Sequence, residues 1–200
     1  MQKLPQALLL AIAAVLCAPA LAQGAPVARV QVEGQWFEGQ AEVAGTALRL
    51  NGTGIRAVAW FKGYAAGLYL PSAASTPEQA VEMPGPKRIQ IRMLNDVPAE
   101  EFVKALNKGV ARNVTPQELA ALQDGLAQFA RQVGALKQVK TGDVVNLDHE
   151  PGRGLLMRVN GTLRGDPIGG DDLFAAVLRS FVGQRPFDEK LKAGLLGRKG

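Results

Sequence analysis

The sequence predicts an α+β domain in which helices cover one face of an antiparallel sheet. Strand-like alternation dominates residues 27–70, and residues 98–133 have helical periodicity. From residue 143 the chain returns to strand patterns, which a terminal helix follows. Strands and helices that are grouped in blocks, rather than alternating one by one, are typical of this class.

The first block contains two short strand patterns and a longer one. Polar and apolar residues alternate in VARVQVEGQ at 27–35 and in TALRLNGTG at 46–54, where the second pattern stops at a glycine turn. A longer strand is expected for AWFKGYAAGLYL at 59–70. Gly63 and Gly67 mark places in it that a bulky side chain would obstruct.

A short helix and another strand connect this block to the helical one. Thr76 can cap the helix, because Pro77 follows it in the position that proline favours at a helix start. The segment RIQIRML at 88–94 alternates cleanly and predicts a strand.

The middle block predicts two helices. In the first, at 97–113, the apolar residues Phe102, Leu106 and Val110 share one face. The second starts at Thr115, and Glu118 three residues later completes a capping box. Its apolar stripe consists of Leu119, Leu122, Leu126, Phe129 and Val133.

The third block predicts a meander and two helices. Turn signals at 151–154 and 160–161 divide residues 143–166 into three antiparallel strands. A helix at 169–183 and a last short helix at 187–197 follow.

The N-terminal residues are typical of a secretory signal peptide. MQKLPQ carries one lysine and no acid, and the apolar run after it is too short to span a bilayer comfortably. Ala20 and Ala22 supply the small residues that a signal peptidase needs, so we expect cleavage before Gln23. Removal of 1–22 leaves 23–200 as a single domain.

The composition narrows the location and the partners. The only cysteine, Cys17, raises a lipoprotein alternative, but Leu16 before it is the wrong size for that processing. A signal with no later apolar run of membrane-spanning length predicts a soluble periplasmic protein. The net charge of +5 comes without a lysine and arginine stripe, so no nucleic-acid partner is expected.

Several kinds of site are not expected. The only histidine, His149, stands between Asp148 and Glu150 at a strand end, where a solvated turn residue is the simplest interpretation. With one histidine and no cysteine in the mature chain, we expect neither a metal site nor a serine–histidine–acid triad. The sequence contains no phosphate-binding loop that would indicate a nucleotide cofactor. Asp171 and Asp172 are explained by their place at the positive end of a helix.

Four passages resemble a known family. They are LNGTGIRAVAWFKGYAAGLYLP at 50–71, LNDVPAEEFVKALNKGV at 94–110, the segment 141–183, and LKAGLLG at 191–197. The chain resembles the chalcone isomerase superfamily, and more closely the bacterial exported chalcone isomerase-like proteins. The resemblance implies an open-faced β-sandwich, in which a layer of helices lies on a large antiparallel sheet.

The resemblance also points to site residues. Arg56 matches the arginine that steers and stabilises the phenolate in the plant enzymes, and Ser180 matches a Thr or Ser that contacts the substrate ring. Tyr64 stands where the enzymes have a threonine, Phe102 where they have a tyrosine, and Gly109 where they have an asparagine. Because Phe102 cannot hydrogen-bond a water at the ketone, chalcone cyclisation is not the first expectation.

The superfamily includes non-catalytic members that bind fatty acids, with the arginine meeting the carboxylate. The first hypothesis is therefore a periplasmic, non-catalytic binding protein for a small amphipathic acid, fatty or aromatic, held by Arg56 and needing no cofactor. The expected ligand-binding residues are Arg56, Tyr64, Phe102 and Ser180, and the expected apolar walls are Trp60, Tyr64, Phe102, Leu106 and Phe181.

Two further hypotheses differ in what they predict. An isomerase, or intramolecular lyase, predicts a hydroxyl of Tyr64 or Ser180 in the same cavity as Arg56. A structural or interaction protein predicts no cavity, and an exposed apolar patch in its place. The alternatives that involve no ligand are that Arg56 points to solvent or pairs with an internal acid, and that the Ser180 hydroxyl forms a hydrogen bond with the backbone of its own helix.

Overall fold

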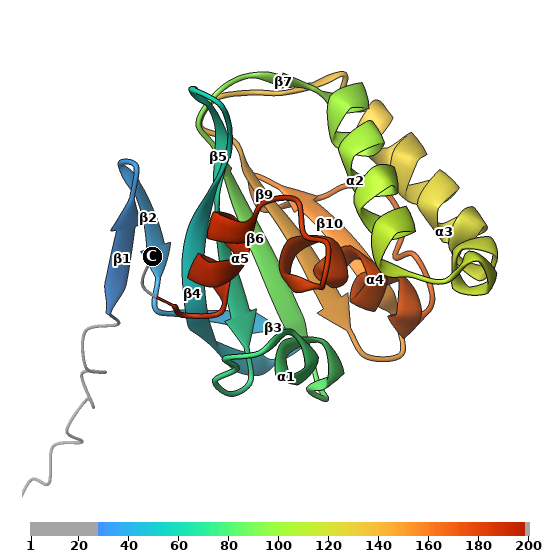
Figure 1. The fold of residues 1–200 in the computed structure, drawn as a ribbon, viewed down its shortest axis with the longest axis horizontal. Helices are drawn as coiled ribbons and strands as arrows, with labels where there is room; N and C mark the ends of the chain where they lie inside the picture. Colours follow the sequence, from blue (N-terminus) through green and yellow to red (C-terminus); the bar gives the residue numbers. More distant parts are fainter. Residues whose placement is uncertain (1–27, 199–200) are drawn as a thin grey trace, which may run out of the picture.

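The computed structural model in Figure 1 describes residues 28–198. The expected signal peptide and its cleavage point lie outside these residues. The main sheet has seven strands in the order β11-β10-β9-β6-β5-β4-β3, and all of its neighbours pair antiparallel. Its strands are β3 (Gln40–Val43), β4 (Thr46–Val58), β5 (Phe61–Leu70), β6 (Lys87–Met93), β9 (Val144–Glu150), β10 (Gly154–Val159) and β11 (Thr162–Leu163).

Helices lie on one face of this sheet, and two short ribbons flank it. Figure 1 shows α2 and α3 side by side across one part of the sheet, with α5 against β4. The ribbons pair β1 (Arg29–Val32) with β2 (Gln35–Glu38), and β7 (Val97–Pro98) with β8 (Gln138–Val139). The helices are α1 (Pro77–Glu82), α2 (Ala99–Asn113), α3 (Pro116–Gly134), α4 (Asp171–Val182) and α5 (Glu189–Leu195).

The core lies between the sheet and the helices. Alternate residues of β6, namely Ile89, Ile91 and Met93, are buried against helix residues such as Val110 and Phe181. This alternation places one face of each strand in the core, as the pattern of RIQIRML predicts. The α+β fold with helices on one face of an antiparallel sheet is therefore confirmed.

The opposite face of the sheet carries a buried ionic cluster. Asp148 on β9 is 1% exposed, and its two carboxylate oxygens accept hydrogen bonds from Arg88 on β6 at 2.6 and 2.7 Å. Arg158 on β10 lies 3.6 Å from the same carboxylate. One acid thus ties three neighbouring strands together on this face.

The caps of two helices are confirmed as predicted. The Thr115 hydroxyl accepts from the amide of Glu118 at 3.2 Å, and the Glu118 carboxylate accepts from the Thr115 amide at 2.6 Å. Thr76 forms the same arrangement with Gln79 at the start of α1.

The glycine turn expected after residue 50 is wrong. Strand β4 continues through Gly52 and Gly54 to Val58, and the chain turns at Ala59, whose φ is +53°. The two glycines admit the backbone of α5 instead. A Cβ on Gly52 would lie 2.1 Å from the carbonyl oxygen of Gly194, so a glycine here serves close backbone approach.

Four short strands were not expected, namely β2, β3, β7 and β8. Residues 35–43 form β2 and β3, each of four residues, joined to their partners by turns with left-handed backbone. Phe37 on β2 is fully buried and lies over Gly67, where a Cβ would come 2.8 Å from its ring. The prediction that Gly67 leaves room for a neighbour is therefore confirmed, whereas at Gly63 a Cβ would make only ordinary contacts.

His149 is not a solvated turn residue, so that interpretation is wrong. It is 6% exposed on β9, and its ring stacks on Phe174 at 5.2 Å. Its Nε2 lies 2.8 Å from a carboxylate oxygen of Asp171 and its Nδ1 lies 3.2 Å from the carbonyl of Gly85. The hydrogen bond with His149 lowers the pKa of the Asp171 carboxyl below its usual value.

Candidate functional site

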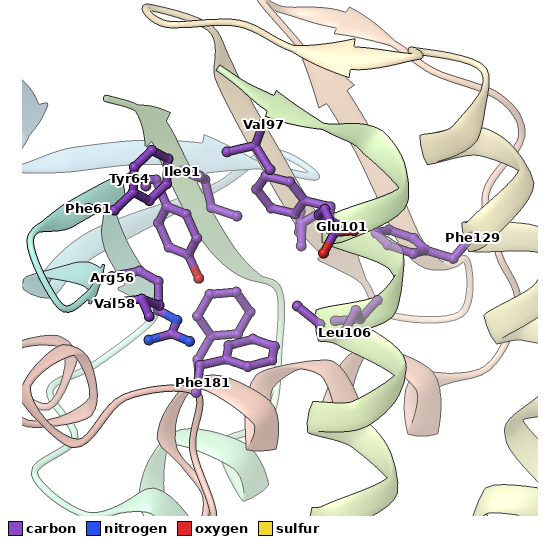
Figure 2. A pocket seen from close by; sticks show the side chains of 15 residues that line it. Arg56, Val58, Phe61, Tyr64, Ile91, Val97, Glu101, Leu106, Phe129 and Phe181 are labelled. Carbon is purple, nitrogen blue, oxygen red and sulfur yellow. The ribbon is translucent and has the colours of Figure 1, made fainter. Parts of the chain in front are cut away.

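A pocket opens between the far half of the β4–β5 hairpin, helix α2 and the segment that joins α4 to α5 (Figure 2). Its cavity volume is about 150 Å³, and the pocket is open to solvent at its mouth. Its lining consists of Arg56, Val58, Phe61, Gly63, Tyr64, Ile91, Val97, Glu101, Phe102, Ala105, Leu106, Phe129, Leu147, Phe181 and Phe187.

The lining is strongly aromatic. Five of the seven phenylalanines of the chain belong to it. The rings of Tyr64 and Phe102 stack at 5.9 Å, and those of Phe181 and Phe187 meet edge to face at 5.0 Å. Such a wall binds apolar chains or rings without selecting a hydrogen-bonding pattern.

Arg56 is the main cationic group in the lining. It stands on β4 directly across from Tyr64, so that both side chains lie on the helix-covered face. Its Nη1 donates to the carbonyl of Ala57 at 2.9 Å and lies 3.4 Å from Asp188. No other described residue accepts from its Nε or Nη2, which leaves a two-pronged donor edge for a carboxylate.

Asp188 reaches Arg56 because of how α5 is docked. The glycine contacts between β4 and α5 bring the helix start to the pocket, and Asp188 is its N-cap. Its Oδ1 accepts from the amides of Lys190 and Leu191 at 2.8 and 2.9 Å. Only Oδ2 is left to face Arg56, so the internal ion pair is long and uses a single donor.

Tyr64 supplies the neutral polar group. The residue is 8% exposed, and Figure 2 shows its hydroxyl pointing into the same space as the Arg56 guanidinium. Burial raises the pKa of the Tyr64 phenol well above its usual range; Arg56 opposes this shift and Asp188 adds to it. The phenol therefore stays protonated at neutral pH and acts as a hydrogen-bond donor.

Three of the four expected ligand-binding residues share this pocket. Arg56, Tyr64 and Phe102 line it, as do the expected walls Leu106 and Phe181. Ser180 is not in the lining: it is fully buried in α4, and its hydroxyl donates to the carbonyl of Ala176 at 3.2 Å.

The expectation that Trp60 forms a wall is wrong. Trp60 is 93% exposed, because it occupies the turn of the β4–β5 hairpin beyond the pocket. The space that an asparagine would fill at Gly109 is occupied by Phe187, since a Cβ there would lie 2.4 Å from that ring.

Sequence reasoning missed two residues that shape the site. Phe187 and Asp188 precede α5, and only the capping signal of an aspartate before a helix was available to find them. Their placement depends on long-range packing of α5 on β4, which no local pattern encodes.

Two other kinds of feature, a metal site and a membrane-spanning helix, are not found in the part of the chain that the structure describes. No cluster of three or more histidine, aspartate or glutamate side chains there could hold a metal ion. None of the helices between residues 28 and 198 is long and apolar enough to cross a membrane.

The fold has relatives among solved structures. A fatty-acid binding protein of Arabidopsis thaliana superposes with a TM-score of 0.68, at 16% sequence identity, over 84% of this chain and 96% of that chain. Residues 29–197 match the model of the chalcone isomerase-like family, and the chain belongs to this family. The resemblance seen in the four sequence passages is thereby confirmed. The search of curated proteins found no match.

Proposed function

We propose that the protein is a non-catalytic binding protein for a small amphipathic acid, fatty or aromatic. The carboxylate meets Arg56 and Tyr64, and the apolar part lies among the phenylalanines of the pocket. The observation that carries this proposal is the unused donor edge of Arg56 beside a protonated phenol, in a cavity whose lining is otherwise apolar except for Glu101. A carboxylate satisfies both donors, whereas a neutral apolar ligand satisfies neither.

The structural neighbour is named as a fatty-acid binding protein, which supports the same class of ligand. The N-terminal residues 1–22 support export, and we place the mature protein in the periplasm. There it would meet acids that cross the outer membrane or leave the inner one.

Calorimetric titration with dodecanoate and with dodecanol tests the proposal, since the two differ only in the charged head. We expect dodecanoate to bind the wild type, and Arg56→Ala to lower the affinity for dodecanoate at least about tenfold. Arg49→Ala is the matched control, because Arg49 is an exposed arginine on the same strand and away from the pocket. Equal affinity for acid and alcohol would overturn the proposal.

An isomerase is the second candidate, and one observation favours it. The Tyr64 hydroxyl lies in the same cavity as Arg56, as that hypothesis predicts. A buried neutral phenol could donate to a ketone oxygen while the guanidinium stabilises a phenolate. Turnover of a chalcone by the wild type, abolished in Tyr64→Phe, would establish this activity; inertness toward chalcones and related enones would leave binding alone.

A further inference from the structure

An apolar tip stands at the mouth of the pocket. The described chain has six large hydrophobic residues that are substantially exposed, and three of them fall within positions 58–61. Val58 is 58% exposed, Trp60 93% and Phe61 45%. Isolated exposed hydrophobic residues are ordinary, but three at one hairpin turn form a patch that calls for a partner.

This tip is continuous with the binding pocket. Val58 and Phe61 line the pocket and are also exposed, so one apolar surface runs from the turn to the interior. Trp60 lies beyond the lining and makes no wall of the pocket. A molecule that covers the tip therefore also faces the pocket mouth.

The base of the tip is held in place. Lys62 pairs with Glu33 in the β1–β2 turn at 2.8 Å, and its carbonyl accepts from Asn95 at 2.8 Å. These contacts anchor β5 to both neighbouring segments directly behind the turn. The turn itself consists of Ala59 and Trp60, and the left-handed backbone of Ala59 directs the chain sharply back.

The geometry of the tip decides between partners. A stable contact between two protein copies needs about 20–30 residues on each side, far more than a four-residue turn offers. A lipid bilayer needs no such area, and tryptophan is the side chain that favours its interface, since an apolar ring carries one N–H donor. Acids of the class proposed above partition into bilayers, so the bilayer that supplies the ligand would meet the pocket at this tip.

We propose that the β4–β5 tip, with Trp60 at its point, inserts into the surface of a lipid bilayer and opens the pocket toward it. The hairpin enters the headgroup region while the sheet and helices stay in water. The acid then passes between bilayer and pocket along Val58 and Phe61 without crossing bulk water. This inference rests on the proposed function for its cargo, but the docking itself is measurable without any ligand.

Binding to protein-free vesicles of phosphatidylethanolamine and phosphatidylglycerol tests the proposal by co-sedimentation. We expect Trp60→Ala to lower vesicle affinity by roughly tenfold or more, as the loss of one large buried apolar side chain implies. Trp36→Ala is the matched control, because Trp36 is the other tryptophan of the chain, is 49% exposed and lies outside the pocket lining. In a Trp36→Phe variant, the fluorescence of Trp60 alone should shift to the blue when vesicles are added.

The readouts separate docking from ligand binding. Trp60→Ala should keep its affinity for dodecanoate in solution but should no longer take up dodecanoate from vesicles. Arg56→Ala should bind vesicles as the wild type does but should no longer bind dodecanoate. The proposal is overturned if the wild type does not bind the vesicles, which would point to a protein partner. It is also overturned if Trp60→Ala and Trp36→Ala weaken vesicle binding equally.

Discussion

The guanidinium of Arg56 and the carboxylate of Asp188 lie 3.4 Å apart at the wall of the pocket. Both side chains are partly exposed, at 28% and 17%, and the contact uses one oxygen of an acid whose other oxygen caps α5. Asp188 thus holds Arg56 in place while leaving most of its donors free. It also places a second negative charge beside the proposed carboxylate.

Neutralising Asp188 should strengthen acid binding. Asparagine keeps the N-cap hydrogen bond but removes the charge that competes for Arg56. We expect Asp188→Asn to raise the affinity for dodecanoate several-fold, measured by calorimetry, with little change in thermal stability. A fall in affinity would mean that the charge of Asp188 is needed to orient Arg56.

Tyr64→Phe should lower the affinity for the acid ligand without destabilising the fold. No described residue shares a hydrogen bond with the Tyr64 hydroxyl, and no buried side-chain oxygen or nitrogen of the described residues lacks a partner. The hydroxyl is therefore accessible from the pocket, and its removal leaves no buried group unpaired. A hydrogen bond to a carboxylate contributes about 1.5–3 kcal/mol, which predicts a loss of roughly tenfold or more in affinity. Tyr69→Phe is the control, since Tyr69 lies on the opposite face of β5 and outside the pocket. Unchanged affinity in Tyr64→Phe would remove the phenol from the site.

The stability of the protein should fall in alkali. Burial raises the pKa of Tyr69 to about 12 and that of Tyr64 still further, from an unfolded value of 10.0. Above pH 10 the unfolded chain releases phenolic protons that the folded chain retains, so the free energy of unfolding decreases with rising pH. This contribution is fully present below pH 10. Denaturant unfolding together with tyrosinate absorbance measures it, and a folded protein whose tyrosines ionise near pH 10 would contradict the account.

The ionic cluster on the opposite sheet face should matter for stability and not for binding. Asp148→Asn leaves Arg88 without its charged partner in a nearly buried place. Removing one member of such a pair destabilises by about 3 kcal/mol or more, which denaturant unfolding will detect. Glu42→Gln on β3 is exposed, and we expect a change within about 0.5 kcal/mol. Equal effects of the two substitutions would show that the cluster contributes no more than a surface charge.

The sequence was sufficient where local physics decides. The capping box at Thr115, the cap at Thr76 and the alternation of 88–94 predicted their elements correctly, because each depends on neighbours along the chain. The glycines at 52 and 54 were misassigned to a turn. The same residue type serves tight turns and close backbone contacts, and only the position of α5 distinguishes the two.

The site was predictable only in part, because some of its residues depend on contacts between distant parts of the chain. Arg56, Tyr64 and Phe102 were identified by the family resemblance. Asp188 stands 132 positions from Arg56 along the chain, and it reaches the pocket together with Phe187 through the docking of α5. Trp60 shows the opposite case: its apolar character suggested a wall, but the turn that exposes it falls within the segment 59–70 that was expected to be a strand.

Native mass spectrometry of the mature protein from its own host tests the central claim most directly, alongside Arg56→Ala and Arg49→Ala. We predict a bound acid of defined mass in the wild type and in Arg49→Ala, and its absence in Arg56→Ala. An unliganded mass in all three proteins, or the same bound mass in Arg56→Ala, would contradict the claim that Arg56 holds a carboxylate.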